Sequence, residues 1–243
     1  MLNKELKLGN FNYALSHSRL SDYNQCPLKF KLKYIDKADN FKEDVNKSVH
    51  LVRGSNVHKA LENYVIKVNA GEKGIRESSL PEVENTKPFI AKIFETYPVV
   101  HPELQISVDQ NWKIVDWFSK DSYYRAIFDL VALKPGHVFV GDYKTGKFTD
   151  YTPSSGYGQL ELSSAIALSI WPEAEQVDNS YIYVDHRKIV TKTYTRADLP
   201  RLVSHFVAEH EKVNSDTEFK PKVNEFCKWC QASKNQCPYS RKM

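Results

Sequence analysis

The feature that most constrains this chain is a β-hairpin pattern with an aspartate in each strand. Two runs of β-branched and aromatic residues flank Pro135-Gly136, a dipeptide typical of tight turns. With these two residues as the loop, the pairing register places Asp129 directly opposite Asp142. Opposed residues have Cβ atoms only about 4.5–5.5 Å apart, and Lys144 shares the face of Asp142 because side chains alternate along a strand. The hairpin therefore predicts two close carboxylates with a lysine beside them.

The hairpin is otherwise apolar on both faces, so we expect it to lie in the centre of a covered sheet. Two facing aspartates are costly there, because like charges repel and lose hydration. A divalent cation would remove that cost, and oxygen ligands suit Mg²⁺ or Mn²⁺. The alternative is an ordinary strand end in which Lys144 neutralises Asp142. The facing Asp129 and an upstream histidine, His58, favour the metal site.

The rest of the chain alternates between helical and strand patterns. We expect helices over 16–35 (interrupted near Cys26-Pro27), 47–70, 89–97, 157–170 and 197–214, and strands over 104–108, 113–118, 123–133, 137–144, 181–185 and 189–195. The polar segment 71–88 is expected to be a surface excursion, and 219–243 a loop-rich cysteine segment. This order predicts an α/β protein with a mixed sheet flanked by helices.

Composition sets the broad class. With 243 residues, 41% of them hydrophobic and 12% aromatic, the chain can bury a real core and is not disordered. It has no run of about 18 apolar residues and no apolar stretch near its N-terminus, so we expect neither a membrane span nor a signal peptide. We expect a reducing cytoplasm, bacterial, archaeal or that of a viral host, in which structural disulfides are rare. There is no phosphate-binding G-x4-G-K-[ST] loop, so no motor is expected.

The chain resembles the RecB-like branch of the PD-(D/E)XK nucleases. The resemblance is carried by Asp129 with Asp142-Tyr143-Lys144, by Arg53-Gly54-x3-His58, and by Leu15-Ser16 through Tyr23-x2-Cys26-Pro27-x2-Phe30. It implies one nuclease domain, 1–243, with a restriction-endonuclease-like core over 47–215 and a cysteine region formed by 15–45 and 219–243. It also implies that His58, Asp129, Asp142 and the Tyr143 carbonyl bind the metal, with Lys144 as the catalytic lysine.

Phosphodiester hydrolysis fits these residue types. It needs an activated water and neutralisation of the charge that grows on the phosphate oxygens. A metal ion can supply both, and the His58 nitrogen tilts the preference toward Mn²⁺ over Mg²⁺. Glu62, one turn after His58, is either a support for the ligands or a solvated helix glutamate. Glu103 matches a glutamate that family members carry before the first strands.

The cysteines form a second pattern. Cys227-x2-Cys230-x6-Cys237 is metal-ligand spacing, and Cys26 can complete a set of four. Four unrelated thiols, a structural zinc site and a [4Fe–4S] cluster are the alternatives. The iron–sulfur branch of the RecB-like family, which includes AddB-type and CRISPR-associated nucleases, has one early and three late cysteines, and this favours the cluster. Such a cluster would join the N- and C-terminal segments as a staple.

These features predict a metal-dependent DNA exonuclease that favours single-stranded ends. The alternatives are a structure-specific endonuclease or trimming nuclease in a larger complex, a non-catalytic module that binds DNA ends, and a redox sensor. The resemblance also allows protein partners in a recombination or CRISPR-like complex. A net charge of only +4 requires a local basic and aromatic groove. Its candidate residues are Arg53, Lys147, Tyr151, Tyr157 and Gln159, the last of which matches a helix glutamine of the RecB-like branch.

Overall fold

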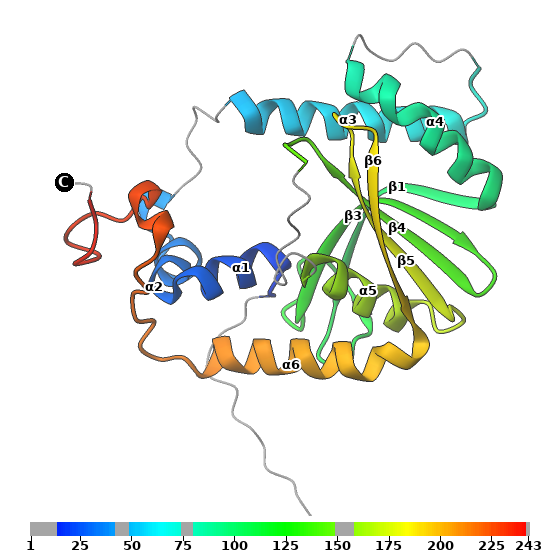
Figure 1. Ribbon diagram of the computed structural model, residues 1–243. Coiled ribbons are helices and arrows are strands. Elements are labelled where there is room, and N and C mark those ends of the chain that lie inside the picture. Colours follow the sequence, from blue (N-terminus) through cyan, green and yellow to red (C-terminus); the bar gives the residue numbers. More distant parts are fainter. Residues whose placement is uncertain (1–13, 42–48, 74–79, 149–157, 242–243) are drawn as a thin grey trace, which may run out of the picture. The chain divides into compact units, whose positions relative to one another are not determined.

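The computed structural model describes residues 14–41, 49–73, 80–148 and 158–241. The chain divides into two compact units. The first, Met1–Lys47 with His205–Met243, is called the terminal unit, and the second, Ser48–Ser204, the sheet unit. Figure 1 labels the elements of both. No helix within the described ranges is both long and apolar enough to cross a membrane.

The sheet unit is built on six strands in the order β2-β1-β3-β4-β5-β6. Their bounds are β1 Val99–Val108, β2 Ile114–Val115, β3 Tyr124–Lys134, β4 His137–Lys144, β5 Gln176–Tyr183 and β6 Lys188–Thr195. Neighbouring strands are antiparallel except β4 and β5, which are parallel. The sheet is therefore mixed, and the predicted hairpin β3–β4 occupies its centre, as expected.

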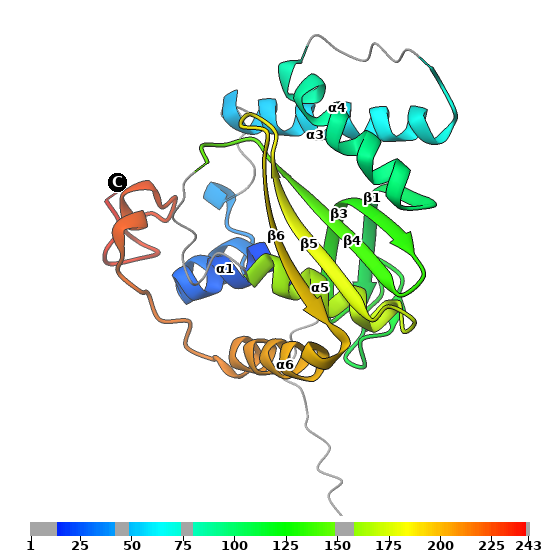
Figure 2. The same cartoon turned by 45° about the vertical axis from the view of Figure 1, so that its right-hand side comes forward.

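Helices cover both faces of this sheet (Figure 2). On one face lie α3, Val49–Asn69, and α4, Pro81–Thr96, and on the other α5, Gly158–Ile170. The stripe Val57, Leu61 and Val65 of α3 is fully buried in a core that also includes α4 and the central strands. Burying such a stripe supplies most of the stability of a helix of this kind.

The two central strands separate part-way along their length. Their pairing runs from Lys134↔His137 to Leu130↔Gly141, which confirms the register predicted from the Pro-Gly turn. Beyond that point the two strands no longer pair with each other, while β3 continues to pair with β1 and β4 continues to pair with β5. We call this opening between β3 and β4 the fork. The next residues in the register, Asp129 and Asp142, lie at its mouth.

The terminal unit joins segments from the two ends of the sequence. Its N-terminal part contains α1, His17–Gln25, α2, Pro27–Phe30, a π-helix, Lys31–Ile35, and a short 3₁₀ helix, Asp39–Phe41. Its C-terminal part contains residues 205–215 of α6, Leu199–Ser215, and the 3₁₀ helix Glu225–Trp229. Aromatic contacts and hydrogen bonds connect the two parts, including Tyr23 with Phe219 and Tyr23 Oη with Asp216 Oδ2 at 2.8 Å.

Several boundaries differ from the sequence-based expectations. Helix α4 begins at Pro81, inside the segment 71–88 that was expected to be a polar excursion, because Val83 and Ile90 are buried despite an internal proline. Strand β1 begins at 99 instead of 104, and β2 spans two residues of the strand expected over 113–118. Strand β5 begins at 176 instead of 181, and the buried Asn179 in this earlier part donates from Nδ2 to the Leu160 carbonyl and to Ser163 Oγ of α5.

Candidate active site and cysteine pocket

The fork places both aspartates where strand pairing ends. Asp129 accepts a hydrogen bond through Oδ2 from the Tyr143 backbone N–H at 2.8 Å, so a side chain takes the place of a missing strand partner. Both carboxylates are largely shielded from solvent, with 14% and 17% of the side chain exposed for Asp129 and Asp142. The two acids predicted from the sequence are thus held in one partly buried place.

Helix α3 brings His58 to the same place. Its Nδ1 lies 3.3 Å from Asp129 Oδ1, and its ring packs edge-on against Tyr143. Burial alone would lower the pKa of His58. The hydrogen bond with Asp129 and the negative charges of Asp129 and Asp142 outweigh burial, so the pKa lies above its ordinary value.

Asp142 also contacts Lys144, two residues along the same strand, and Gln159 of helix α5. Gln159, on α5, donates from Nε2 to Asp142 Oδ1 at 2.5 Å and accepts through Oε1 from Lys144 Nζ at 3.0 Å. Lys144 Nζ lies 2.6 Å from Asp142 Oδ2 and 4.7 Å from the ring centre of Tyr181. Burial raises the pKa of Asp142; Lys144 opposes this rise and Asp129 adds to it. The lysine is therefore held by three neighbours at the mouth of the fork.

Two glutamates extend the acidic group. Glu103 is the residue opposite Asp129 in the β1–β3 register, and its backbone has a φ of 40°. Burial and the charge of Glu62 raise the pKa of Glu103, and the two glutamates share a hydrogen bond. Glu62 also pairs with Lys59 at 2.8 Å. Glu103 thus adjoins Asp129, and Glu62 adjoins Glu103.

The donor set at the fork suits a divalent cation. Asp142 Oδ2 is buried and its contact with Lys144 Nζ at 2.6 Å is an ion pair instead of a well-aligned hydrogen bond, so the oxygen can also bind a cation. A cation would also offset the mutual repulsion of the two aspartates. Across the described residues, no three His, Cys, Asp or Glu side chains are close enough to hold a metal as they stand. Because His58 and the Tyr143 N–H now engage Asp129, binding would exchange these contacts for bonds to the metal.

Comparison with known proteins identifies the family of this chain. A family profile described as the PD-(D/E)XK nuclease superfamily matches residues 14–238. The chain belongs to the PD-(D/E)XK nuclease superfamily. The structure reported as "Crystal structure of SSO0001" is similar over 90% of this chain and 83% of that chain, with 15% sequence identity and a TM-score of 0.44. No curated protein sequence matches.

Three of the five residues expected to contact DNA, Arg53, Lys147 and Gln159, lie in the described part of this PD-(D/E)XK protein. The Arg53 guanidinium pairs with Glu82 of α4 and with Asp185 after β5, and 39% of its side chain is exposed, so its contact with DNA stays a prediction. Lys147 is exposed just after β4. Tyr151 and Tyr157 lie outside the described residues.

Gln159 makes two contacts that the sequence did not predict. The family pattern suggested a contact to DNA, whereas its side chain bridges Asp142 and Lys144. Tyr181, beneath Lys144, was not singled out at all. Its register partner on the parallel neighbouring strand is Asp142. A correct β4–β5 register would have identified it, but a parallel pairing has no local turn that fixes its register.

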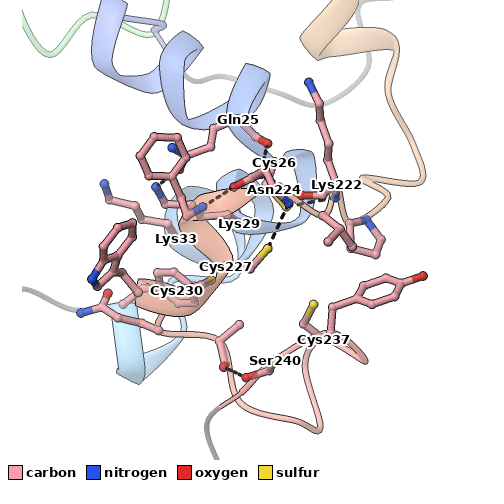
Figure 3. A pocket seen from close by; sticks show the side chains of 18 residues that line it. Gln25, Cys26, Lys29, Lys33, Lys222, Asn224, Cys227, Cys230, Cys237 and Ser240 are labelled. Atoms are coloured by element: carbon pink, nitrogen blue, oxygen red, sulfur yellow. Dashed lines mark hydrogen bonds between the residues drawn. The ribbon is translucent and has the colours of Figure 1, made fainter.

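All four cysteines line one cavity of the terminal unit, with a volume of about 360 Å³ (Figure 3). They are free thiols, and Cys230 and Cys237 pack against a small apolar cluster. Backbone N–H groups donate to two of the sulfurs at 3.4 Å, from Lys222 to Cys26 and from Asn224 to Cys227. Such bonds stabilise thiolate ligands and tune iron–sulfur clusters. The thiols are of the type that binds zinc or an iron–sulfur cluster, but no three of the four described sulfurs are close enough to hold one metal ion as they stand.

Proposed function

We propose that this protein is a metal-dependent deoxyribonuclease that degrades DNA from its ends and favours single-stranded ends. The observation that carries the proposal is the constellation at the fork, where Asp129 and Asp142 lie beside His58 and Lys144. A non-catalytic binding module would not need a lysine fixed between a carboxylate and an amide. The end preference and the strand preference are supported by resemblance to RecB-like nucleases.

In the proposed site, His58, Asp129, Asp142 and the Tyr143 carbonyl hold Mn²⁺ or Mg²⁺. The metal, when bound, polarises the scissile phosphate and lowers the pKa of a water. Lys144 supplies an ammonium to orient that water or to stabilise the charge that grows on the phosphate. Gln159 holds both Lys144 and Asp142, so the lysine does not depend on the carboxylate alone for its position. Glu62 and Glu103 fix the acidic side of the site.

We also propose that Cys26, Cys227, Cys230 and Cys237 hold a [4Fe–4S] cluster. The shared cavity and the N–H···S bonds support it. The cluster would supply a cross-link between the two sequence segments of the terminal unit; a zinc ion would supply the same cross-link with the same ligands. Iron and acid-labile sulfide near four per chain support the cluster, and one zinc per colourless chain would assign the site to zinc.

The activity is tested with four substrates of equal nucleotide concentration: 5′-labelled and 3′-labelled linear DNA, and closed circles of single- and double-stranded DNA. Each is incubated with Mn²⁺, Mg²⁺ or EDTA, with Asp142→Asn as the matched inactive control. Loss of linear DNA with intact circles supports an exonuclease. Cut circles would assign an endonuclease, and no cleavage of any substrate would contradict nuclease activity.

A further inference from the structure

A group of aromatic side chains is exposed in the terminal unit beside the cysteine cavity. Phe226, Trp229 and Tyr239 are 47%, 64% and 53% exposed, and all three line that cavity. Large aromatic side chains are usually buried, so several exposed around one cavity indicate a surface that binds a ligand or another macromolecule. We call Phe226, Trp229 and Tyr239 the aromatic patch.

The charge around the aromatic patch identifies the sign of its partner. The 25 residues from 219 to 243 contain six Lys or Arg and one Glu, a net charge of +5, although the whole chain carries only +4. The remainder of the chain is therefore slightly acidic. Among the described residues, no acidic side chain forms an ion pair with the exposed Lys228, Lys234 or Arg241. The positive charge is local and open to a polyanion.

The rings are held in place by the local fold. Phe226 and Trp229 lie three residues apart in the 3₁₀ helix Glu225–Trp229, and this spacing puts side chains on the same side. Their ring centres are 6.2 Å apart. Asn224 caps the helix by accepting from the Phe226 N–H at 2.9 Å, and its side chain also donates to the Gln25 carbonyl at 2.9 Å. The patch is therefore pre-organised.

Trp229 also has a cation close by. Lys228 Nζ lies 3.9 Å from the ring centre of Trp229, within the range of a cation–π contact. A ring beside an ammonium matches the two parts of a nucleotide, because the base stacks on the ring and the phosphate pairs with the cation.

We propose that the aromatic patch is a binding site for single-stranded nucleic acid, at which bases stack on Phe226 and Trp229 while Lys228 and its neighbouring cations contact phosphates. The choice of a nucleic acid over an acidic peptide rests on the proposed nuclease function. Unpaired strands are required because paired bases do not expose their faces. This site is separate from the residues assigned to the fork.

The test measures binding of fluorescein-labelled dT₂₀ to the full-length protein in EDTA, where no cleavage occurs. Trp229→Ala and Phe226→Ala should each weaken binding about fivefold or more, since a stacking contact has that effect. Trp229→Phe, which keeps an aromatic ring, should bind within about twofold of the parent protein. Lys228→Ala should lower the slope of log Kd against log salt by about one.

The matched control is Phe118→Ala. Phe118 is 88% exposed and lies 5.9 Å from the Arg125 guanidinium, so it has the same kind of surroundings in the sheet unit. Unchanged binding by this variant, with unchanged melting temperatures for all variants, assigns the loss to the aromatic patch. An equal loss in Phe118→Ala would overturn the specific assignment.

An abasic oligonucleotide with the same number of phosphates separates stacking from charge. The parent protein should bind it more weakly than dT₂₀, and Trp229→Ala should add no further loss. Parent-like binding of dT₂₀ by Phe226→Ala and Trp229→Ala overturns the proposal even if the protein cleaves DNA. Loss of dT₂₀ binding in these variants supports it even if no cleavage is found. Binding to anionic vesicles with the same sensitivity to Trp229→Ala would identify a lipid surface and contradict the proposal. Binding to rU₂₀ with the same sensitivity would identify RNA as a ligand, which agrees with the proposal of a single-stranded nucleic acid.

Discussion

Gln159 and Asp142 are joined by a hydrogen bond of 2.5 Å that connects helix α5 to strand β4. The same amide accepts from Lys144 at 3.0 Å. One neutral side chain thus sets the positions of a carboxylate and an ammonium that lie two residues apart. Because it bears no charge, it can do so without changing the electrostatic balance of the site.

Replacement of Gln159 by leucine should reduce the rate of cleavage more than the affinity for DNA. We expect kcat to fall about tenfold or more, because misplaced catalytic groups lose that much, with the DNA Kd within about twofold. Single-turnover cleavage and binding in EDTA measure the two quantities. The control is Glu161→Gln, two residues along α5, where the side chain pairs with Arg201. A large change in the Kd for DNA with an unchanged kcat would instead indicate that Gln159 contacts DNA.

Removal of Lys144 or Asp142 should abolish cleavage. We expect Lys144→Met and Asp142→Asn to lose at least about 100-fold in kcat under Mn²⁺, because each removes a charge that acts in the transition state. Circular dichroism and DNA binding should remain close to those of the parent. Lys113→Met, at an exposed lysine, is the control. Full activity of either site variant under Mn²⁺ would remove the fork from the mechanism.

The cysteine ligands should be equivalent despite their distance in sequence. If one metal group is held by all four, Cys26→Ser should lower the melting temperature and the bound metal content as much as Cys230→Ser, because each breaks the same cross-link. Gln231→Ala, next to Cys230, controls for local disturbance. Metal content that survives Cys26→Ser but not Cys230→Ser would restrict the site to the C-terminal cysteines.

Arg53 should matter for stability. Arg53→Ala leaves Glu82, which is 7% exposed, and Asp185 without their cation. We expect the free energy of unfolding to fall by about 1–2 kcal/mol, since an uncompensated and largely buried carboxylate is unfavourable. Urea unfolding measures this, and Arg53→Lys should recover part of the loss. Weakened DNA binding at unchanged stability would instead support the original expectation of a DNA contact.

His210 should make the protein less stable as the pH falls below neutral. Burial lowers the pKa of His210 from 6.5 to about 4, and Asn214 Nδ2 lies 2.9 Å from its Nδ1. The unfolded chain binds a proton near pH 6.5 while the folded chain does not, so stability is full above pH 6.5 and declines toward pH 4. The decline amounts to at most about 3 kcal/mol. Unfolding of His210→Leu and the parent at pH 7.5 and 4.5 measures the difference, and an identical pH dependence would contradict it.

The central hairpin of the sheet could be predicted because the residues that determine it are close together in the sequence. A two-residue turn fixed the register of β3 and β4, and with it the relation of Asp129 to Asp142. The start of α4 was not predicted, because the internal Pro88 argues against a helix that tertiary burial of Val83 and Ile90 stabilises, although Pro81 stands in the first turn, where proline is favourable.

The missed parts of the site depend on contacts between elements. The proximity of Arg53 to His58 in sequence does not indicate its ion pairs, because their partners lie on α4 and after β5, more than 25 and 130 residues away. The bridge made by Gln159 likewise requires the packing of α5 on the sheet. Sequence spacing within one helix or hairpin carries no record of such distant contacts.

The composition of the terminal unit from two separated segments has a consequence for biosynthesis. Residues 14–41 leave the ribosome about 160 residues before 205–241, whereas the sheet unit between them is complete first. Contacts of high sequence separation form slowly. Tyr23 and Gln25 therefore cannot form their hydrogen bonds with Asp216 and Asn224 until the C-terminal segment has been synthesised. Helices α1 and α2 are therefore expected to become ordered after the sheet unit, although they are translated before it.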